Sequence, residues 1–248
     1  MADSRWFACR CVSEAAVRLY CFPHSGGAAG EYVRWAGHVR GVEICGLQPP
    51  GRGERFAEEP PARFADLVEA IAREARFQEP FAFFGHSLGA IVAYELVRSL
   101  RAASAPLPEH LFVSACPAPH LGRRRPPARE RSDDELLAEI EALGGPLPPE
   151  IGEDPDAVRI AVLQHRADAE LLDTYRFEPG EPLDLPVTAV GGAQDDVGRD
   201  RLDAWRQHTS GAFQVRLLPG GHFYFRDRPH DLLQVLVDAL AMPSRAHR

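Results

Sequence analysis

Lysine is absent from this chain of 248 residues, so arginine supplies every permanent positive charge on its side chains. Acidic residues outnumber basic ones, and the formal net charge is −8. A protein that binds nucleic acid needs a concentrated basic surface, because release of counterions from the phosphates supplies much of the affinity. The composition therefore argues against nucleic acid as a partner.

Long apolar runs are also missing. No stretch approaches the roughly 20 apolar residues that a helix needs to cross a bilayer. The first residues, Met1–Trp6, lack the charged and apolar segments of a secretory signal. We therefore expect a cytoplasmic protein without a membrane partner.

Cysteine is sparse and irregularly spaced. The five cysteines form no C-x-x-C pair, and an odd, scattered set indicates neither a disulfide framework nor a zinc site. We expect reduced thiols and no metal centre. The five are Cys9, Cys11, Cys21, Cys45 and Cys116.

Strand-like and helix-like segments alternate along the chain. This alternation is typical of an α/β protein with a mostly parallel sheet and helices on both faces. The length suits one domain spanning residues 1–248. The expected strands include Val17–Phe22, Phe81–Phe84, Leu111–Ala115, Leu185–Val190 and Phe213–Leu218.

One turn in this pattern carries chemistry. Gly85-His86-Ser87-Leu88-Gly89 lies directly between the strand-like Phe81–Phe84 and a helix-like stretch that begins at Ala90. A G-x-S-x-G turn in this setting predicts a nucleophile elbow, because its glycines permit a sharp, strained turn that holds the serine at the sheet edge. A serine hydroxyl is a weak nucleophile until a base takes its proton. The motif therefore predicts a histidine and an acid later in the chain.

The order of the partners in hydrolases with this elbow is serine, then acid, then histidine. His222 follows a strand and the turn Pro219-Gly220-Gly221, which places it on a late loop where a general base is expected. The acid is expected after the preceding strand, and Asp195 is our choice, with Asp196 as its main competitor. A carboxylate there would accept from the ring N–H of His222 and stabilise the imidazolium form.

The oxyanion of such a hydrolase needs two N–H donors. One is the backbone N–H of Leu88, the residue after the nucleophile. The other is expected from the glycine-rich exit of the first strand, Pro23–Gly30, and is the N–H of either His24 or Ser25. An ordinary strand-to-helix turn or an anion cradle is the alternative for this loop.

Residues 117–182 are too many for a simple connection, so we expect a helical lid inserted into the domain. Ser132 predicts the cap of a helix that Gly144-Gly145-Pro146 ends, and the apolar spacing from Val158 to Leu172 predicts a longer amphipathic helix. Our hypothesis is that the lid shapes an acyl pocket and gates access to it. The alternative is that these apolar faces only pack on the core.

In this order, the motifs resemble those of type II thioesterases, the stand-alone editing α/β-hydrolases found beside modular polyketide synthases and nonribosomal peptide synthetases. Each motif alone is modest, but the ordered set covers nearly the whole chain. The resemblance implies the α/β-hydrolase fold and a triad of Ser87, Asp195 and His222, although the proline that commonly follows the acid is here Asp196. The matching segments are Cys21–Ala28, Gln48–Arg55, Gly85–Gly89, Leu163–Asp168, Gly191-Gly192 with Asp195, and Gly221–Phe225.

The resemblance also implies the substrate and the partner. The substrate would be an acyl group on the phosphopantetheine thioester of an acyl or peptidyl carrier domain. Ser87 would form an acyl-enzyme with His222 as base, and water would release the acid without a metal or redox cofactor. The enzyme, expected as a monomer, would edit stalled or misprimed modules.

A local basic cluster stands out in this acidic chain. It consists of Arg123-Arg124-Arg125, followed by Arg129 and Arg131. Carrier domains are generally acidic, so the resemblance suggests that this cluster meets the carrier or its phosphate. A solvated loop is the alternative.

Other functions share the same motifs. A small-molecule carboxylester or lactone hydrolase would use the same triad, and an acyl-transferring or cyclising enzyme would pass the acyl group to another nucleophile. A scaffold that only binds an acyl ligand or a carrier is a third class. The intact Ser87, Asp195 and His222 argue against that class.

Overall fold

A computed structural model describes residues 5–10, 12, 15–122 and 126–241. Within these residues, seven strands form one sheet in the order β1-β3-β2-β4-β5-β6-β7. β1 pairs antiparallel with β3 and every other neighbouring pair is parallel, which confirms the expected mostly parallel sheet. The strands are β1 (Phe7–Arg10), β2 (Val17–Phe22), β3 (Val42–Leu47), β4 (Phe81–His86), β5 (Leu111–Ser114), β6 (Val187–Gly192) and β7 (Phe213–Leu218).

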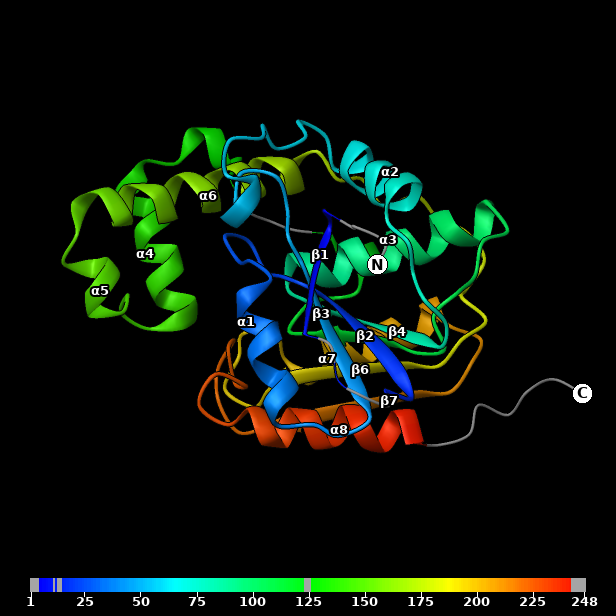
Figure 1. The fold of residues 1–248 in the computed structure, drawn as a ribbon. Coiled ribbons are helices and arrows are strands. Elements are labelled where there is room, and N and C mark those ends of the chain that lie inside the picture. Colours follow the sequence, from blue (N-terminus) through cyan, green and yellow to red (C-terminus); the bar gives the residue numbers. More distant parts are fainter. Residues whose placement is uncertain (1–4, 11, 13–14, 123–125, 242–248) are drawn as a thin grey trace, which may run out of the picture.

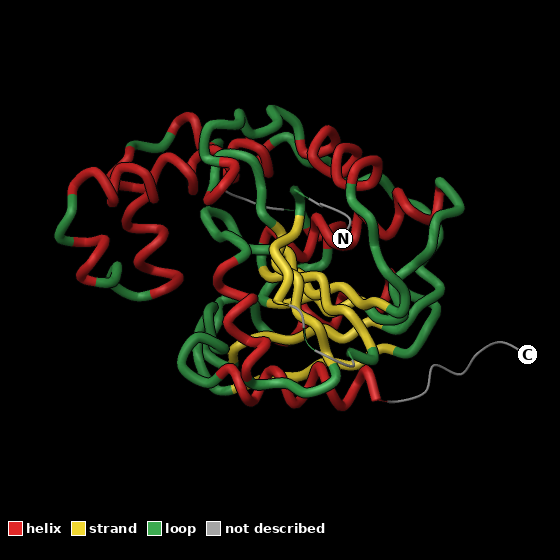
Figure 2. The backbone as a smooth tube through the Cα atoms, in the orientation of Figure 1, coloured by secondary structure: helices red, strands yellow, loops and turns green. Residues whose placement is uncertain are grey.

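Helices cover both faces of the sheet (Figures 1 and 2). In Figure 1, α2 and α3 lie above the strands and α8 lies below them. The α-helices are α1 (Gly30–Val33), α2 (Phe64–Glu74), α3 (Leu88–Ala102), α4 (Asp133–Gly144), α5 (Pro149–Gly152), α6 (Pro155–Asp173), α7 (Arg199–Asp203) and α8 (Pro229–Ala241). Short 3₁₀ turns are η1 (Arg34–Gly37), η2 (Gly53–Arg55), η3 (Pro119–Leu121), η4 (Ala128–Glu130) and η5 (Ala204–His208).

The central strand β4 shows why the sheet needs two covers. Phe81 and Phe83 join the core beneath α2 and α3, whereas Ala82 and Phe84 join the core beneath α1 and α8. Successive side chains of a strand point to opposite faces, so a continuous apolar run is buried on both sides. All six residues of β4 are buried.

The connection between β5 and β6 forms a helical group beside the sheet, on the left of Figure 1. The predicted helix after Ser132 is confirmed, and a capping box joins Ser132 and Glu135 at its start. The predicted longer amphipathic helix is also confirmed and is α6, which Asp154 caps. The short α5 between them has no counterpart among the predicted elements.

The ends of the expected strands differ from the observed ones mainly at β6. That strand begins at Val187, after Pro186, because proline has no N–H to give to the ladder. Strands β2 and β7 have the predicted bounds. Strands β1 and β3 were not predicted, and their pairing changes the interpretation of the cysteines.

The expectation that all five cysteines are reduced thiols is wrong for one pair. Cys9 of β1 and Cys45 of β3 form a disulfide, with their Cα atoms 4.1 Å apart. The antiparallel register places these two residues directly opposite each other, although 36 positions separate them in sequence. Cys11 lies outside the described residues.

Among the helices described, none combines the length and the apolar character that crossing a bilayer requires.

Candidate active site

Ser87 occupies a strained turn at the carboxyl end of β4. Its backbone has φ 54° and ψ −115°, a conformation that a non-glycine residue adopts rarely and at a cost. The flanking glycines make the turn sterically feasible. A Cβ at Gly85 would lie 2.5 Å from Cα of Ala90, and one at Gly89 would overlap the carbonyl oxygen of Phe22 and lie 2.7 Å from that of Pro23. The backbone therefore holds Ser87 above the sheet edge.

His222 and Asp195 meet at the same edge. They lie on the loops that follow β7 and β6, and His222 Nδ1 is 3.0 Å from Asp195 Oδ2. Both side chains are buried, and the N–H of Val197 donates to the other carboxylate oxygen of Asp195 at 3.3 Å. Gln194 joins the two loops, since its Oε1 accepts from the N–H of Gly220 at 2.6 Å.

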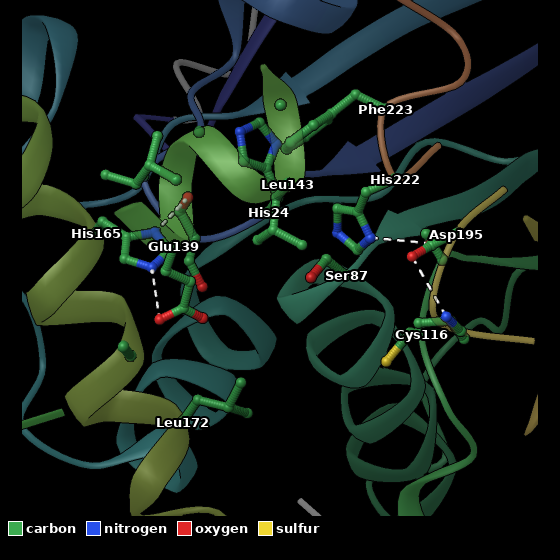
Figure 3. A pocket seen from close by; sticks show the side chains of 18 of the residues that line it. His24, Ser87, Cys116, Glu139, Leu143, His165, Leu172, Asp195, His222 and Phe223 are labelled. Carbon is green, nitrogen blue, oxygen red and sulfur yellow. Dashed lines mark hydrogen bonds and ion pairs between the residues drawn. The ribbon is translucent and has the colours of Figure 1, made fainter. Parts of the chain in front are cut away.

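The other ring nitrogen of His222 points into the cavity that Ser87 lines. His222 Nε2 is buried and has no hydrogen-bond partner among the described residues. Figure 3 shows its ring directed toward Ser87. Hydrogen bonds between a base and its nucleophile are often long before substrate binds. Asp196 lines the cavity as well, but within the described part of the chain it makes no hydrogen bond to His222.

The loop after β2 approaches the elbow from the other side. Its Gly26 N–H donates to Asp168 at 2.8 Å, and its Gly27 N–H donates to the carbonyl oxygen of His24 at 2.9 Å. In the described residues no acceptor is found for the N–H of His24 or of Ser25. The structure therefore leaves both predicted donors available, together with the N–H of Leu88 at the start of α3.

Two histidines beside the elbow have lowered pKa values because their rings are withdrawn from water. Burial lowers the pKa of His86 well below its usual value, and nearby His222 adds to the effect. Burial likewise lowers the pKa of His24, with Arg226 as the next cause. His86 Nδ1 and Ser114 Oγ lie 2.8 Å apart and form a hydrogen bond. Either atom can be the donor, depending on the tautomer of His86.

A second hydrogen bond continues from Ser114 to the loop that carries His222. Ser114 Oγ lies 2.8 Å from the hydroxyl of Tyr224, which is two residues after His222. Burial raises the pKa of Tyr224 far above its usual value, so the hydroxyl remains protonated. The two hydrogen bonds His86–Ser114 and Ser114–Tyr224 therefore connect the elbow after β4 with the end of β5 and with the His222 loop.

A cavity of about 1900 Å³ opens above Ser87. The sheet edge forms its floor, and residues of α4, α5 and α6 form one wall, including Ile140, Leu143 and Ile151. A polar group lies within this wall: Glu139 pairs with Arg131, and its carboxylate is 3.8 Å from Nε2 of His165. Leu143, Glu139 and His165 are visible across the cavity from His222 in Figure 3.

Comparison with known proteins identifies the family. A family model described as a thioesterase domain matches residues 17–240. The chain belongs to the thioesterase family. It is a hydrolase, a thioesterase of the serine type.

Relatives of this thioesterase come from biosynthetic clusters. It is 33% identical over 244 residues to the gramicidin S biosynthesis protein GrsT of Aneurinibacillus migulanus, a match that covers 96% of this chain and 95% of GrsT. It is 37% identical over 231 residues to thioesterase PikA5 of Streptomyces venezuelae, covering 91% of this chain and 82% of PikA5.

Solved structures of type II thioesterases and related enzymes have the same fold as this chain. The type II thioesterase BorB from the borrelidin biosynthetic cluster superposes with a TM-score of 0.85 at 35% identity, covering 95% of this chain and 97% of BorB. RedJ from the prodiginine pathway of Streptomyces coelicolor gives 0.83 at 37% identity, covering 91% of this chain and 85% of RedJ. These matches confirm the predicted α/β-hydrolase fold and the resemblance to type II thioesterases.

The predicted basic cluster of the thioesterase divides into parts. Arg123, Arg124 and Arg125 lie outside the described residues, so their contact with a carrier stays a prediction. Arg129 is exposed and lies 3.6 Å from Glu130. The side chain of Arg131 is mostly buried and pairs with Glu139 at the cavity wall.

Two charged residues in the family-like segments had no role in the sequence interpretation. Arg52 and Asp168 form a buried ion pair, with Nη2 and Oδ2 2.6 Å apart. The sequence did contain a signal for Asp168, because this charged residue lies on the same buried face of α6 as Leu171 and Leu172. Such a residue usually needs a partner, but the partner lies 116 positions away and no local pattern points to it.

Proposed function

We propose that this thioesterase hydrolyses acyl groups from the phosphopantetheine thioester of acyl or peptidyl carrier domains, and that it thereby edits stalled or misprimed synthase modules. The observation that carries the proposal is the buried Asp195–His222 hydrogen bond of 3.0 Å, with the free Nε2 of His222 facing a serine on a strained elbow. Family membership supports thioester chemistry at this site. The biosynthetic origin of GrsT and BorB supports a carrier-bound substrate.

The proposed reaction proceeds through an acyl-enzyme. Ser87 Oγ attacks the thioester carbonyl carbon while His222 Nε2 takes the hydroxyl proton, and Asp195 stabilises the resulting imidazolium. The oxyanion accepts hydrogen bonds from the N–H of Leu88 and from the N–H of His24 or Ser25. Collapse of the tetrahedral intermediate breaks the C–S bond, and the pantetheine sulfur leaves with the proton from His222.

Water then completes the cycle. His222 removes a proton from a water molecule, which attacks the acyl-enzyme, and collapse of the second intermediate returns the proton to Ser87 Oγ and releases the acid. Only protons and the acyl group are transferred in these steps. We therefore propose no metal or redox cofactor, and the phosphopantetheine belongs to the substrate.

The cavity is consistent with a long substrate. Its volume exceeds the usual range for small-molecule sites, roughly 300–1,000 Å³. Apolar side chains such as Leu143, Ile151 and Leu172 line the wall that an acyl chain would contact. The Glu139–Arg131 pair adds a polar site in the same wall, which suits acyl chains that carry hydroxyl or keto groups.

The experiment is release of free acid from acetyl-, propionyl- and longer acyl-carrier proteins, compared with matched oxygen esters and with the Ser87→Ala variant. We expect serine-dependent turnover that prefers carrier-bound thioesters. Brisk ester cleavage without thioester turnover would assign the chain to carboxylester or lactone hydrolases. Binding of loaded carrier without turnover of either substrate would favour the scaffold.

Carrier recognition is tested separately. We propose that Arg123, Arg124 and Arg125 contact the acidic carrier or its phosphate. Replacing all three with glutamate should raise KM for carrier-bound substrate and leave KM for a small acyl thioester unchanged. An equal rise for both substrates would contradict this contact.

A further inference from the structure

Helix α6 holds one particular peptide group of the loop that follows β2. The N–H of Gly26 donates to Asp168 Oδ2 at 2.8 Å, and the carbonyl oxygen of Ser25 lies 3.5 Å from His165 Nδ1. These two backbone atoms belong to the same peptide group. The two side chains are three residues apart on α6, so they project from one face of the helix.

This peptide group needs to be held because its neighbour is a glycine. Gly26 has φ +83°, in the left-handed region, and glycine changes between backbone regions at little cost. Rotation of the Ser25–Gly26 peptide group would disturb the N–H groups of His24 and Ser25, the two candidates for the second oxyanion donor. An oxyanion donor is effective when it is already oriented before the reaction, so a mobile loop would lower the rate.

The side chain of Asp168 is itself held in place by a second loop. Arg52 from the β3–α2 connection donates through Nη2 to Asp168 Oδ2 at 2.6 Å and to the carbonyl oxygen of Gln164 at 3.1 Å. Both charged side chains are buried. A further hydrogen bond joins α6 to this loop, because the side chain of Gln164 donates to the carbonyl oxygen of Gly51 at 3.3 Å. A carboxylate that pairs with a guanidinium is a strong acceptor for a backbone N–H.

We propose that Asp168, held by Arg52, is a positioning residue that fixes the oxyanion loop, the segment Pro23–Gly30 after β2 that carries the two candidate donors. Helix α6 would then influence the rate of catalysis as well as the shape of the cavity. The inference rests on the proposed function, in which this loop supplies the second oxyanion donor. Asp168 does not touch the reacting atoms and acts through the Ser25–Gly26 peptide group. A shift of α6 must break its hydrogen bond to Gly26 or carry the oxyanion loop with it.

The test compares Asp168→Ala and Asp168→Asn with the wild type. Two reactions are followed: hydrolysis of a small acyl thioester, and covalent modification of Ser87 by a fluorophosphonate, which also develops charge on an oxygen at the site. We expect kcat to fall about 100-fold in Asp168→Ala and about tenfold in Asp168→Asn, because misplacing one oxyanion donor costs up to the 10²–10³-fold seen on its removal. KM should stay within about twofold, and the phosphonylation rate should fall in parallel with kcat.

Asp154→Ala is the matched control on the same helix. Its carboxylate accepts the N–H of Asp156 at 2.9 Å and caps α6, far from the loop after β2. This variant should lower the melting temperature by weakening α6 and leave kcat and the phosphonylation rate near those of the wild type. The isosteric Asp168→Asn provides a folded variant if Asp168→Ala does not fold.

Two results would overturn the positioning role: a loss of kcat in the Asp168 variants no larger than in Asp154→Ala, or a raised KM with unchanged kcat. Failure of the proposed function is separately visible. If the wild type is phosphonylated at Ser87 but does not release acid from carriers, the carrier substrate is wrong, and the ratio of phosphonylation rates still decides the role of Asp168.

Discussion

The sheet edge that holds Ser87 and the helical group that faces it are built in opposite ways. All six residues of β4 are buried, and α3 packs against it through most of its length. Across the cavity, α4 buries only Leu136 and α5 buries no residue. The proposed reacting groups therefore lie on a densely packed backbone, whereas the surface expected to meet the acyl chain has few buried residues. Helices with few buried contacts open at low cost in free energy, which suits a segment that admits substrates.

Helix α6 is the exception within the helical group. It buries Val162, His165, Asp168, Leu171 and Leu172, and it contacts both the loop after β2 and the loop after β3. The number of buried residues therefore varies among the helices of this group, and α6 resembles the sheet edge more than it resembles α4 or α5. Substitutions in each region should separate effects on chemistry and folding from effects on substrate choice.

The largest expected effect is at the sheet edge, in Asp195, the proposed acid of the triad. Asp195→Asn should lower kcat by about 10²–10⁴-fold, because the amide favours the wrong tautomer of His222 and cannot stabilise its charged form. Asp196→Asn is the matched control and should change kcat by less than about threefold, since Asp195 makes the hydrogen bond to His222. Steady-state kinetics of the two variants decide between them. A larger loss in Asp196→Asn would move the acid to position 196.

The next contrast concerns backbone crowding. Gly89→Ala should destabilise the fold by about 3 kcal/mol or prevent folding, because its Cβ would overlap the carbonyl oxygen of Phe22. Gly152→Ala in α5 should be neutral or stabilise by up to about 1 kcal/mol, since the nearest atom to its Cβ is 3.5 Å away and alanine favours helix. Urea unfolding measures both. Equal tolerance at the two positions would contradict the difference in packing.

A smaller effect should appear in the pH dependence of stability, and its source is His110, directly before β5 in the sheet. Burial lowers the pKa of His110 to about 4, below the value near 6.5 expected for the unfolded chain. The unfolded state then binds the proton more readily, so His110 lowers the free energy of unfolding as the pH falls from about 6.5 toward 4, by at most about 1.4 kcal/mol per pH unit.

The check on this prediction is urea unfolding at several pH values for wild type and His110→Gln. The variant should lose stability less steeply over the same interval, because glutamine does not titrate. Identical slopes for the two proteins would remove His110 as a source of acid sensitivity. His86 and His24 should contribute in the same direction, since burial lowers the pKa of each.

The smallest effect is expected across the cavity. Leu143→Ala enlarges the wall formed by α4 and should shift the ratio of kcat/KM values for long and short acyl chains by less than about tenfold, with little change in stability. Competition between acyl thioesters of two lengths measures the ratio. A loss of activity toward every chain length would show that this wall supports the chemistry itself.

Local signals in the sequence account for much of the fold and for the predicted site. The glycines around Ser87, the turn before His222 and the Ser132 cap each occupy a few neighbouring positions, and each predicted the element that forms there. Strands β2 and β7 followed from apolar runs bounded by turns. Strand β1 was missed because it is short and exposed at most of its positions.

Interactions between distant segments could not be predicted in this way. The Cys9–Cys45 disulfide depends on β1 lying antiparallel to β3, and the expectation of reduced thiols failed for that reason. The side chain of Arg131 joined the cavity wall because α4, once folded, presents Glu139 to it, 8 positions along the chain. The hydrogen bonds from His86 through Ser114 to Tyr224 likewise join the ends of β4 and β5 to the loop after β7.

The sequence by itself determined the alternation of strands and helices, the nucleophile elbow and the order of its partners, because hydrophobic periodicity, glycine turns and caps act over a few residues. Only the tertiary structure decided that Asp195 and not Asp196 meets His222, and that Asp168 and Arg52 hold the loop after β2. The physical reason is that a buried charge or an oriented peptide group is stabilised by whichever partner folding brings within hydrogen-bond distance, and separation along the chain does not enter that energy.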